Sequence, residues 1–358
     1  MFFEAVQGQP FYGEWMVSPL NLEAAKGSAT DFAGDQPNFP QRFFYCRLDD
    51  QPDHLVPERY LQNETREDSA ERPSLYINPQ SHFAQNGQLP DHLRYLVPWL
   101  GNFDLRADMI WIKEAGSEMD LPFWAGPEFS AFLANARPGD QAPSTLSRES
   151  RRVLATAGVL VPSDYEAVRR KRWAKDIEIS AIKFSQKRYV PIGGLIHPFH
   201  ISALRRYYRS LIRTGKLKLG DSQTPRRYGA HNESVMRFFH QQLTSTVSAI
   251  VGVQVKPSYV YLGSYQSGAD LEIHTDREQC EFSITFCLDF SPEPRRETSW
   301  PLHLHTDRGK TTIFQGIGDA LIYCGGEIPH SRGMLQEGHT STSIFFHYVR
   351  ETFQEPLD

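Results

Sequence analysis

The feature that most constrains the fold is a series of short segments after Gly252 in which apolar and polar residues alternate. Alternation with a period of two is typical of β-strands with one buried face. Turn-forming residues separate the segments, which are 259–262, 282–288, 302–305, 311–314, 320–323 and 341–348. Amphipathic helices are predicted before them over 201–214 and 233–251, the second with Asn232 as N-cap. We therefore expect an α+β fold, a double-stranded β-helix (jelly roll) core backed by helices.

The N-terminal half has a different pattern. Residues up to about 90 are rich in Pro, Gln, Asn and Asp, which predicts loops. Strands are predicted at 109–112 and 159–162, and helices at 128–136 and 147–157. We expect an N-terminal accessory α/β region over 1–175 and the jelly-roll domain with its supporting helices over 176–358. A plain accessory domain is the preferred interpretation, and the alternative is similarity to the winged modules that bind leader peptides.

Composition and charge limit the classes of function. The 358 residues carry a net charge of -5, but residues 169–227 hold sixteen Lys/Arg and three acids. This basic segment either docks an anionic partner or faces the protein's own acidic residues. Its charges are not interleaved as in a nucleic-acid motif, so we expect no nucleic-acid partner. Four separated cysteines, no apolar run of membrane-spanning length and no signal peptide lead us to expect a cytoplasmic protein without membrane contact.

A His-Thr-Asp motif at His274 and Asp276 is the main chemical signal. In a strand the two side chains would point to one side, because the side-chain period is two. His330, about fifty residues later, would complete a 2-His-1-carboxylate face of the kind that holds iron(II). The motif occurs again at His305 and Asp307, but only about 25 residues before His330, which leaves too few strands for a jelly roll. We therefore favour the first copy as the metal ligands.

From Glu233 to Tyr348, about a third of the chain, the sequence resembles the prolyl-4-hydroxylase-like branch of the iron(II)/2-oxoglutarate-dependent oxygenases. The matching features, in order, are the helix ending at Val251-Gly252, a tyrosine-containing strand before His-Xaa-Asp, the strand 282–288, the turn 318–321, Pro329-His330 and the closing strand. The resemblance implies iron(II) bound by His274, Asp276 and His330, with 2-oxoglutarate as co-substrate. It implies a dioxygenase that hydroxylates an unactivated C–H bond. Retention of Asp276 argues against halogenation, while desaturation and ring closure stay open.

The resemblance also implies a cation for the distal carboxylate of 2-oxoglutarate. In the family it usually lies some ten residues after the second histidine, which here is Thr340 and uncharged. Arg332 is the preferred substitute, and Lys310 is the second choice. Tyr265 matches a tyrosine that contacts the co-substrate in relatives. A polar inner wall of the barrel is predicted from alternating positions 283, 285 and 287.

The substrate is predicted only by class. We expect an amino-acid side chain, free or within a peptide, and the basic segment could hold an anionic one. A small natural-product intermediate is the alternative within this enzyme class. A non-catalytic jelly-roll binding module is the rival, favoured by the uncharged Thr340, and a cupin-type metal enzyme is a third option.

The remaining histidines have less specific interpretations. His197 and His200 are predicted at a helix N-terminus instead of in a metal site, because Pro198 disrupts the spacing. His231 and His240 are predicted to flank or face a helix.

Overall fold

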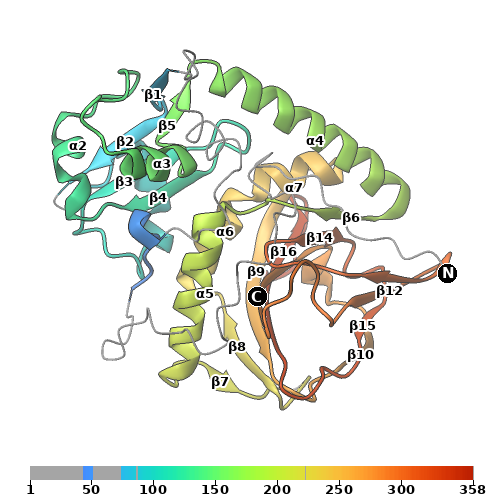
Figure 1. The fold of residues 1–358 in the computed structure, drawn as a ribbon. Helices are drawn as coiled ribbons and strands as arrows, with labels where there is room; N and C mark the ends of the chain where they lie inside the picture. Colours follow the sequence, from blue (N-terminus) through green and yellow to red (C-terminus); the bar gives the residue numbers. More distant parts are fainter. Residues whose placement is uncertain (1–42, 51–73, 86–87, 222, 358) are drawn as a thin grey trace.

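Most strands of the protein belong to two antiparallel sheets. The computed structural model describes residues 43–50, 74–85, 88–221 and 223–357 (Figure 1). The larger sheet has the order β6-β14-β11-β16-β9-β8-β7, and the smaller has the order β10-β15-β12-β13. The larger sheet comprises β6 (Tyr189–Ile192), β7 (Lys218–Leu219), β8 (Arg227–His231), β9 (Val255–Tyr265), β11 (Phe282–Ser291), β14 (Ala320–Tyr323) and β16 (Thr340–Arg350). The smaller comprises β10 (Leu271–His274), β12 (Leu302–Thr306), β13 (Gly309–Ile313) and β15 (His330–Arg332).

The chain alternates between the two sheets. From β9 onward the larger sheet receives β9, β11, β14 and β16, and the smaller receives β10, β12, β13 and β15. The six predicted strand segments are confirmed as β9, β11, β12, β13, β14 and β16. Strands β10 and β15 were not among these six segments, but the side-chain argument for His274 and His330 placed both histidines on strands, and the structure has them at the end of β10 and the start of β15.

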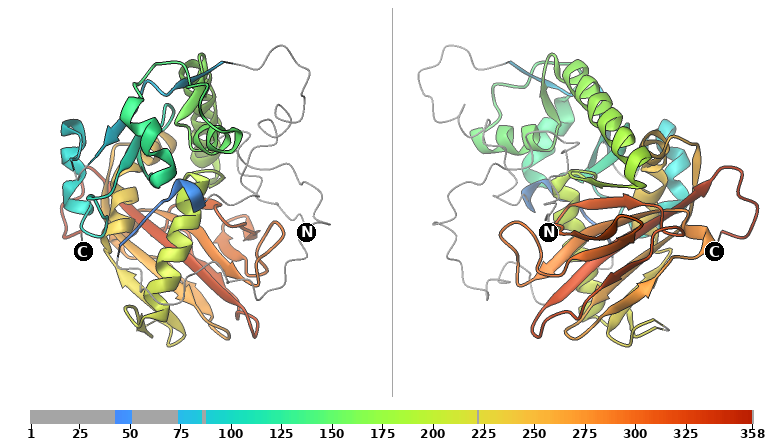
Figure 2. Two further views of the ribbon diagram at one scale, coloured as in Figure 1. Left: turned by 60° about the vertical axis from the view of Figure 1, so that its left-hand side comes forward. Right: turned by 90° about the vertical axis from the view of Figure 1, so that its right-hand side faces the viewer.

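Helices cover the larger sheet. Helix α5 (Pro198–Arg213) packs against β11, and α6 (Ser234–Gln242) and α7 (Thr244–Val251) pack against β9 (Figure 2). The predicted helix 233–251 is thus two helices. The N-cap of α6 is Glu233, whose side chain accepts hydrogen bonds from two backbone N–H groups. The prediction of Asn232 as the N-cap was wrong. Asn232 has a φ of 51°, whereas an N-cap requires an extended backbone.

The N-terminal region forms smaller sheets beside these helices. Strands β2 (Ser81–Ala84), β3 (Met109–Lys113) and β4 (Asp120–Trp124) make one sheet, and β1 (Leu75–Ile77) pairs with β5 (Leu160–Pro162). The predicted helices are confirmed as α2 (Ser130–Asn135) and α3 (Arg148–Thr156). Most of the loops predicted before residue 90 lie outside the described residues.

One helix crosses the predicted domain boundary. Helix α4 (Tyr165–Lys187) packs on α7 and β6 and runs uninterrupted through residues 175 and 176 (Figure 1). The hydrophobic core is also continuous across the boundary, since the Phe103 and Phe238 rings lie 5.0 Å apart. The sequence signal for α4 was obscured by its many charges, which give it a weak apolar stripe.

The basic segment is partly neutralised by the protein's own acids. Arg169 pairs with Glu114 in the interior, and Arg205 pairs with Asp289 at 3.0 Å. Arg188 pairs with Glu327, whereas the partner of Arg227 is Asp221, an acid of the basic segment itself. For Arg169, Arg188 and Arg205 the structure therefore supports the interpretation that the segment faces acids from the rest of the protein. Among the helices of the described ranges, none has the length and apolar character needed to cross a bilayer.

Candidate active site

A cavity of about 410 Å³ is lined by strands of both sheets. The larger sheet contributes Tyr265, Thr285 and Tyr323, among others, and the smaller contributes His330 and Arg332. Such a concave site with a few convergent polar groups is the usual form of a small-molecule site.

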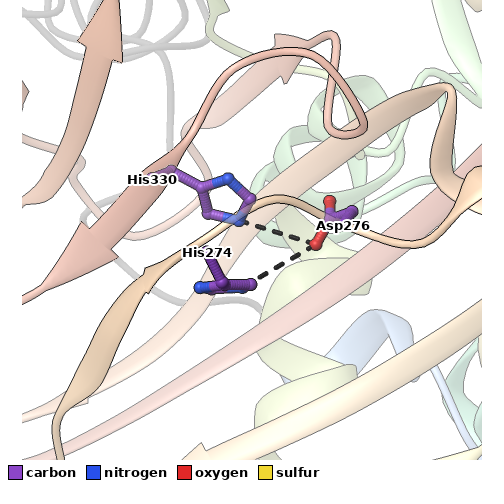
Figure 3. Close-up of side chains that lie close together, drawn as sticks. All are labelled: His274, Asp276 and His330. Carbon is purple, nitrogen blue, oxygen red and sulfur yellow. Dashed lines mark ion pairs between the residues drawn. The ribbon is translucent and has the colours of Figure 1, made fainter.

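His274, Asp276 and His330 meet at one side of this cavity (Figure 3). Strands β10 and β15 pair with His274 opposite His330, and the ring centroids are 4.3 Å apart. The Asp276 Oδ1 atom lies 3.8 Å from His274 Nε2 and 3.6 Å from His330 Nε2. One atom of each side chain therefore faces a common point.

The hydrogen bonds of both imidazoles fix which nitrogen faces Asp276. His330 Nδ1 lies 3.0 Å from the Ile328 carbonyl, and His274 Nδ1 lies 2.8 Å from the Glu272 carbonyl. A carbonyl only accepts, so each Nδ1 carries a proton, and in the neutral imidazole each Nε2 then presents a lone pair. Burial lowers the pKa of His330, which favours its neutral form. Two imidazole nitrogens and a carboxylate oxygen are thus oriented as metal ligands are.

The position of Asp276 is set by other contacts than the strand geometry that the sequence predicted. Strand β10 ends at His274, so the period of a strand does not orient Asp276. Its backbone N–H donates to the Gly325 carbonyl at 3.0 Å, and its Oδ2 accepts from Ser283 Oγ at 2.9 Å. A Cβ on Gly325 would lie 2.3 Å from Oδ2, so only glycine leaves room for the carboxylate here.

Arg332 lies in the same cavity, buried and two residues beyond His330. Its guanidinium stacks 4.8 Å from the Trp300 ring centroid and donates to Gln315 Oε1 at 3.2 Å. Among the described residues no carboxylate lies within ion-pair distance of it, and burial lowers the pKa of Arg332. A buried cation without an acidic partner is costly, which marks it as a candidate anion-binding group. Lys310, the second choice, is exposed on β13 and does not line the cavity.

Tyr265 also lines the cavity, in a network that the sequence did not reveal. Its hydroxyl accepts from Arg227 Nη1 at 3.0 Å, and its ring centroid lies 5.0 Å from that of Trp300. Arg227 in turn pairs with Asp221. The period-two placement of Tyr259, Tyr261 and Tyr265 on one strand was a usable signal for this wall, since such residues share a face.

Two further cavity residues were missed. The Tyr323 hydroxyl lies 3.4 Å from His330 Nε2, and His347 is buried on β16 with its Nδ1 2.9 Å from Ser283 Oγ. Burial lowers the pKa of His347 to about 4. Of the three residues predicted as a polar inner wall, Thr285 lines the cavity and Ser283 contacts Asp276.

Of five other histidines considered in the sequence analysis, four take structural positions and one lines the cavity. His197 is the N-cap of α5 and accepts from the Phe199 N–H, so the predicted position at a helix N-terminus is confirmed. His200, in the first turn of the same helix, is hydrogen-bonded to the Pro122 carbonyl at 2.9 Å. His305 contacts Ser331 Oγ at 3.0 Å and lies outside the cavity lining. His240 faces inward on α6. His231 ends strand β8 shortly before α6, which agrees with the predicted position flanking a helix, and it also lines the cavity.

Comparisons with known proteins give only distant likenesses. No protein-family model matches the chain, and no curated protein matches it. It is similar to the solved structure of a Pseudomonas putida prolyl-4-hydroxylase, at 14% identity and a TM-score of 0.40 over 49% of this chain and 99% of that one. It is also similar to the non-heme alpha-ketoglutarate-dependent epimerase SnoN from nogalamycin biosynthesis, at 13% identity and a TM-score of 0.42 over 50% of this chain and 84% of that one. Both likenesses are limited to about half of this chain.

Proposed function

We propose that this protein is an iron(II)- and 2-oxoglutarate-dependent dioxygenase. The observation that carries the proposal is one cavity that holds both a 2-His-1-carboxylate group and a buried arginine without a carboxylate partner among the described residues. The first is a set of metal donors with one open side, and the second is a site for an organic anion. Neither feature alone would distinguish this function from a structural role.

The donor set fits iron(II). His274 and His330 would each bind it through Nε2, and Asp276 would bind it through Oδ1, the atoms that already face one another. With 2-oxoglutarate, bound iron supplies the activation of dioxygen needed to oxidise an unactivated C–H bond. The Ile328 and Glu272 carbonyls hold both imidazoles in the tautomer that binding requires.

Arg332 would bind the distal carboxylate of 2-oxoglutarate. Arg332 and His330 are two residues apart on one strand, about 7 Å along it, which suits the length of a five-carbon dicarboxylate. Trp300 and Gln315 keep the guanidinium in place, so little side-chain freedom is lost on binding. Tyr265 would contact the co-substrate from the opposite sheet, and its ring supports Trp300.

The order of strands supports a jelly-roll assignment. Eight strands, β9 to β16, divide equally between two facing sheets, which is the arrangement of a double-stranded β-helix. We retain the division into an accessory region over 1–175 and an oxygenase domain over 176–358 as a proposal, with α4 shared between them.

We propose hydroxylation of an amino-acid side chain, free or in a peptide, as the reaction. The cavity of about 410 Å³ accommodates 2-oxoglutarate together with one group of similar size, which fits a side chain or part of a small molecule. A natural-product intermediate therefore stays as the alternative substrate. The main argument for a non-catalytic binding module was the uncharged Thr340. Arg332 weakens that argument, because it lines the cavity and can replace the cation absent at Thr340.

The test is an anaerobic titration of the apoprotein with iron(II) and then 2-oxoglutarate, followed by the weak visible charge-transfer band of the chelate. We expect the band in the wild type and in Asp307→Ala, which alters the second His-Thr-Asp copy. Asp276→Ala should abolish it. Absence of iron binding in the wild type, or loss of the band in Asp307→Ala alone, would show that the proposal is wrong.

A further inference from the structure

A polar pair lies next to Asp276, at the carboxylate oxygen that is not the one nearest the two histidines. Ser283 on β11 and His347 on β16 are cross-strand partners in the larger sheet, and both are buried. Ser283 Oγ is 2.9 Å from Asp276 Oδ2 and 2.9 Å from His347 Nδ1. The serine therefore bridges the imidazole and the carboxylate.

The direction of these hydrogen bonds follows from the number of protons. The Ser283 hydroxyl has one proton, and a carboxylate only accepts, so this proton goes to Asp276 Oδ2. The Ser283 oxygen then accepts from His347, whose Nδ1 must carry a proton. His347 is itself fixed, because its carbonyl oxygen lies 2.8 Å from His240 Nε2 and its ring centroid lies 4.6 Å from that of Tyr259.

This network assigns different tasks to the two oxygens of Asp276. Oδ2 is occupied by Ser283, while Oδ1 faces His274 and His330. A carboxylate held in this way offers a metal one oxygen instead of two. With two imidazoles it leaves three positions of an octahedron open, whereas a chelating carboxylate would leave two.

We propose that Ser283 and His347 are positioning residues that fix Asp276 as a one-oxygen metal ligand. This inference rests on the metal site of the proposed function. Removing the Ser283 hydroxyl frees Oδ2 and allows the carboxylate to rotate, which changes both metal affinity and coordination.

A competing use of His347 is direct metal binding. Asp276, Cys280 and His347 also place one ligand atom each within 4.8 Å of one another. Two contacts favour positioning: His347 Nδ1 is engaged by Ser283, and the Cys280 Sγ lies 3.0 Å from the Tyr259 hydroxyl. The two uses predict different spectra, because a thiolate ligand gives cobalt(II) a near-ultraviolet charge-transfer band.

The experiment is a titration of the full-length apoprotein with cobalt(II) alone, read by its visible and near-ultraviolet absorption. Loss of an outer-shell partner typically lowers metal affinity 10–100-fold, and we expect this for Ser283→Ala, together with altered visible bands. Ser283→Thr, which keeps the hydroxyl, should restore both. Ser264→Ala is the matched control, because Ser264 is a buried serine of the same sheet that accepts one hydrogen bond, from Thr342. It should match the wild type.

His347 is tested by a pair of variants. Asn places an N–H donor near the position of Nδ1 and Leu does not, so His347→Asn should bind cobalt(II) more tightly than His347→Leu. Unchanged affinity and spectrum in Ser283→Ala would overturn the inference while leaving the metal site intact. A near-ultraviolet band that Cys280→Ser removes would also overturn it, in favour of direct binding by Cys280 and His347. If the wild type binds no cobalt(II), the proposed function fails and this inference fails with it.

Discussion

Gly325→Ala should weaken the metal site without replacing any of the three proposed ligands. The added Cβ would lie 2.3 Å from Asp276 Oδ2, 2.5 Å from Ser283 Oγ and 2.8 Å from the Cys280 carbonyl oxygen. Since ordinary contact begins at 3.4 Å, the carboxylate oxygen would have to retreat by about 1 Å. The Cys280 carbonyl oxygen belongs to the backbone and is not the end of a flexible side chain, so it yields less easily than the carboxylate.

The expected magnitude follows from these contacts. Displacement of a metal ligand and loss of its Ser283 hydrogen bond should weaken iron(II) binding about 10–100-fold. Overpacking of a buried site should lower the free energy of unfolding by about 1–3 kcal/mol. Metal titration and urea denaturation measure the two effects separately.

The neighbouring glycine provides the control for this prediction. A Cβ on Gly326 would meet only the Arg277 carbonyl oxygen, at 4.0 Å. Gly326→Ala should therefore bind iron(II) like the wild type and unfold at the same urea concentration. If Gly325→Ala binds iron(II) as tightly as Gly326→Ala, then contact with Gly325 does not determine the position of Asp276.

Three other predictions concern the co-substrate, the second motif and pH. Arg332→Ala should raise the 2-oxoglutarate concentration for half-maximal turnover about tenfold or more, because charge-assisted hydrogen bonds contribute about 1.5–3 kcal/mol. Lys310→Ala is the control at an exposed lysine. If the two variants need the same 2-oxoglutarate concentration, Arg332 is not the anchor. His274→Ala should abolish iron(II) binding in an equilibrium titration, whereas His305→Ala should not, and the reverse result would transfer the ligands to the second motif. Burial lowers the pKa of His200 and of His240 to about 3, below the usual 6.5, so the unfolded chain takes up their protons first. The contribution of these two histidines to the free energy of unfolding is therefore fully present above pH 6.5. It is lost as the pH falls toward 3, by about 1.4 kcal/mol per pH unit for each histidine. His240→Gln should flatten this slope in urea denaturation at a series of pH values, and an unchanged slope would contradict the argument.

The sequence by itself determined the elements whose side-chain pattern repeats. Six strands of the two sheets follow from period-two alternation, and α5 follows from its apolar stripe and from Pro198 at its start. The candidate ligands His274, Asp276 and His330 were also named from sequence, because few side chains bind metals and their spacing limits the choice. Local preference and residue chemistry are properties of the chain alone.

Only the tertiary structure decided how side chains from distant segments meet. Asp276 lies beyond its strand, and the Gly325 backbone and Ser283, both distant in sequence, set its position. Arg332 was named as the anchor from sequence, but its burial, its place in the cavity and its lack of a carboxylate partner among the described residues are properties of the packed structure. His347 looked like one residue of an alternating strand until pairing with β11 brought it beside Ser283. Spacing along a chain limits which residues can meet, but packing between sheets selects which of them do.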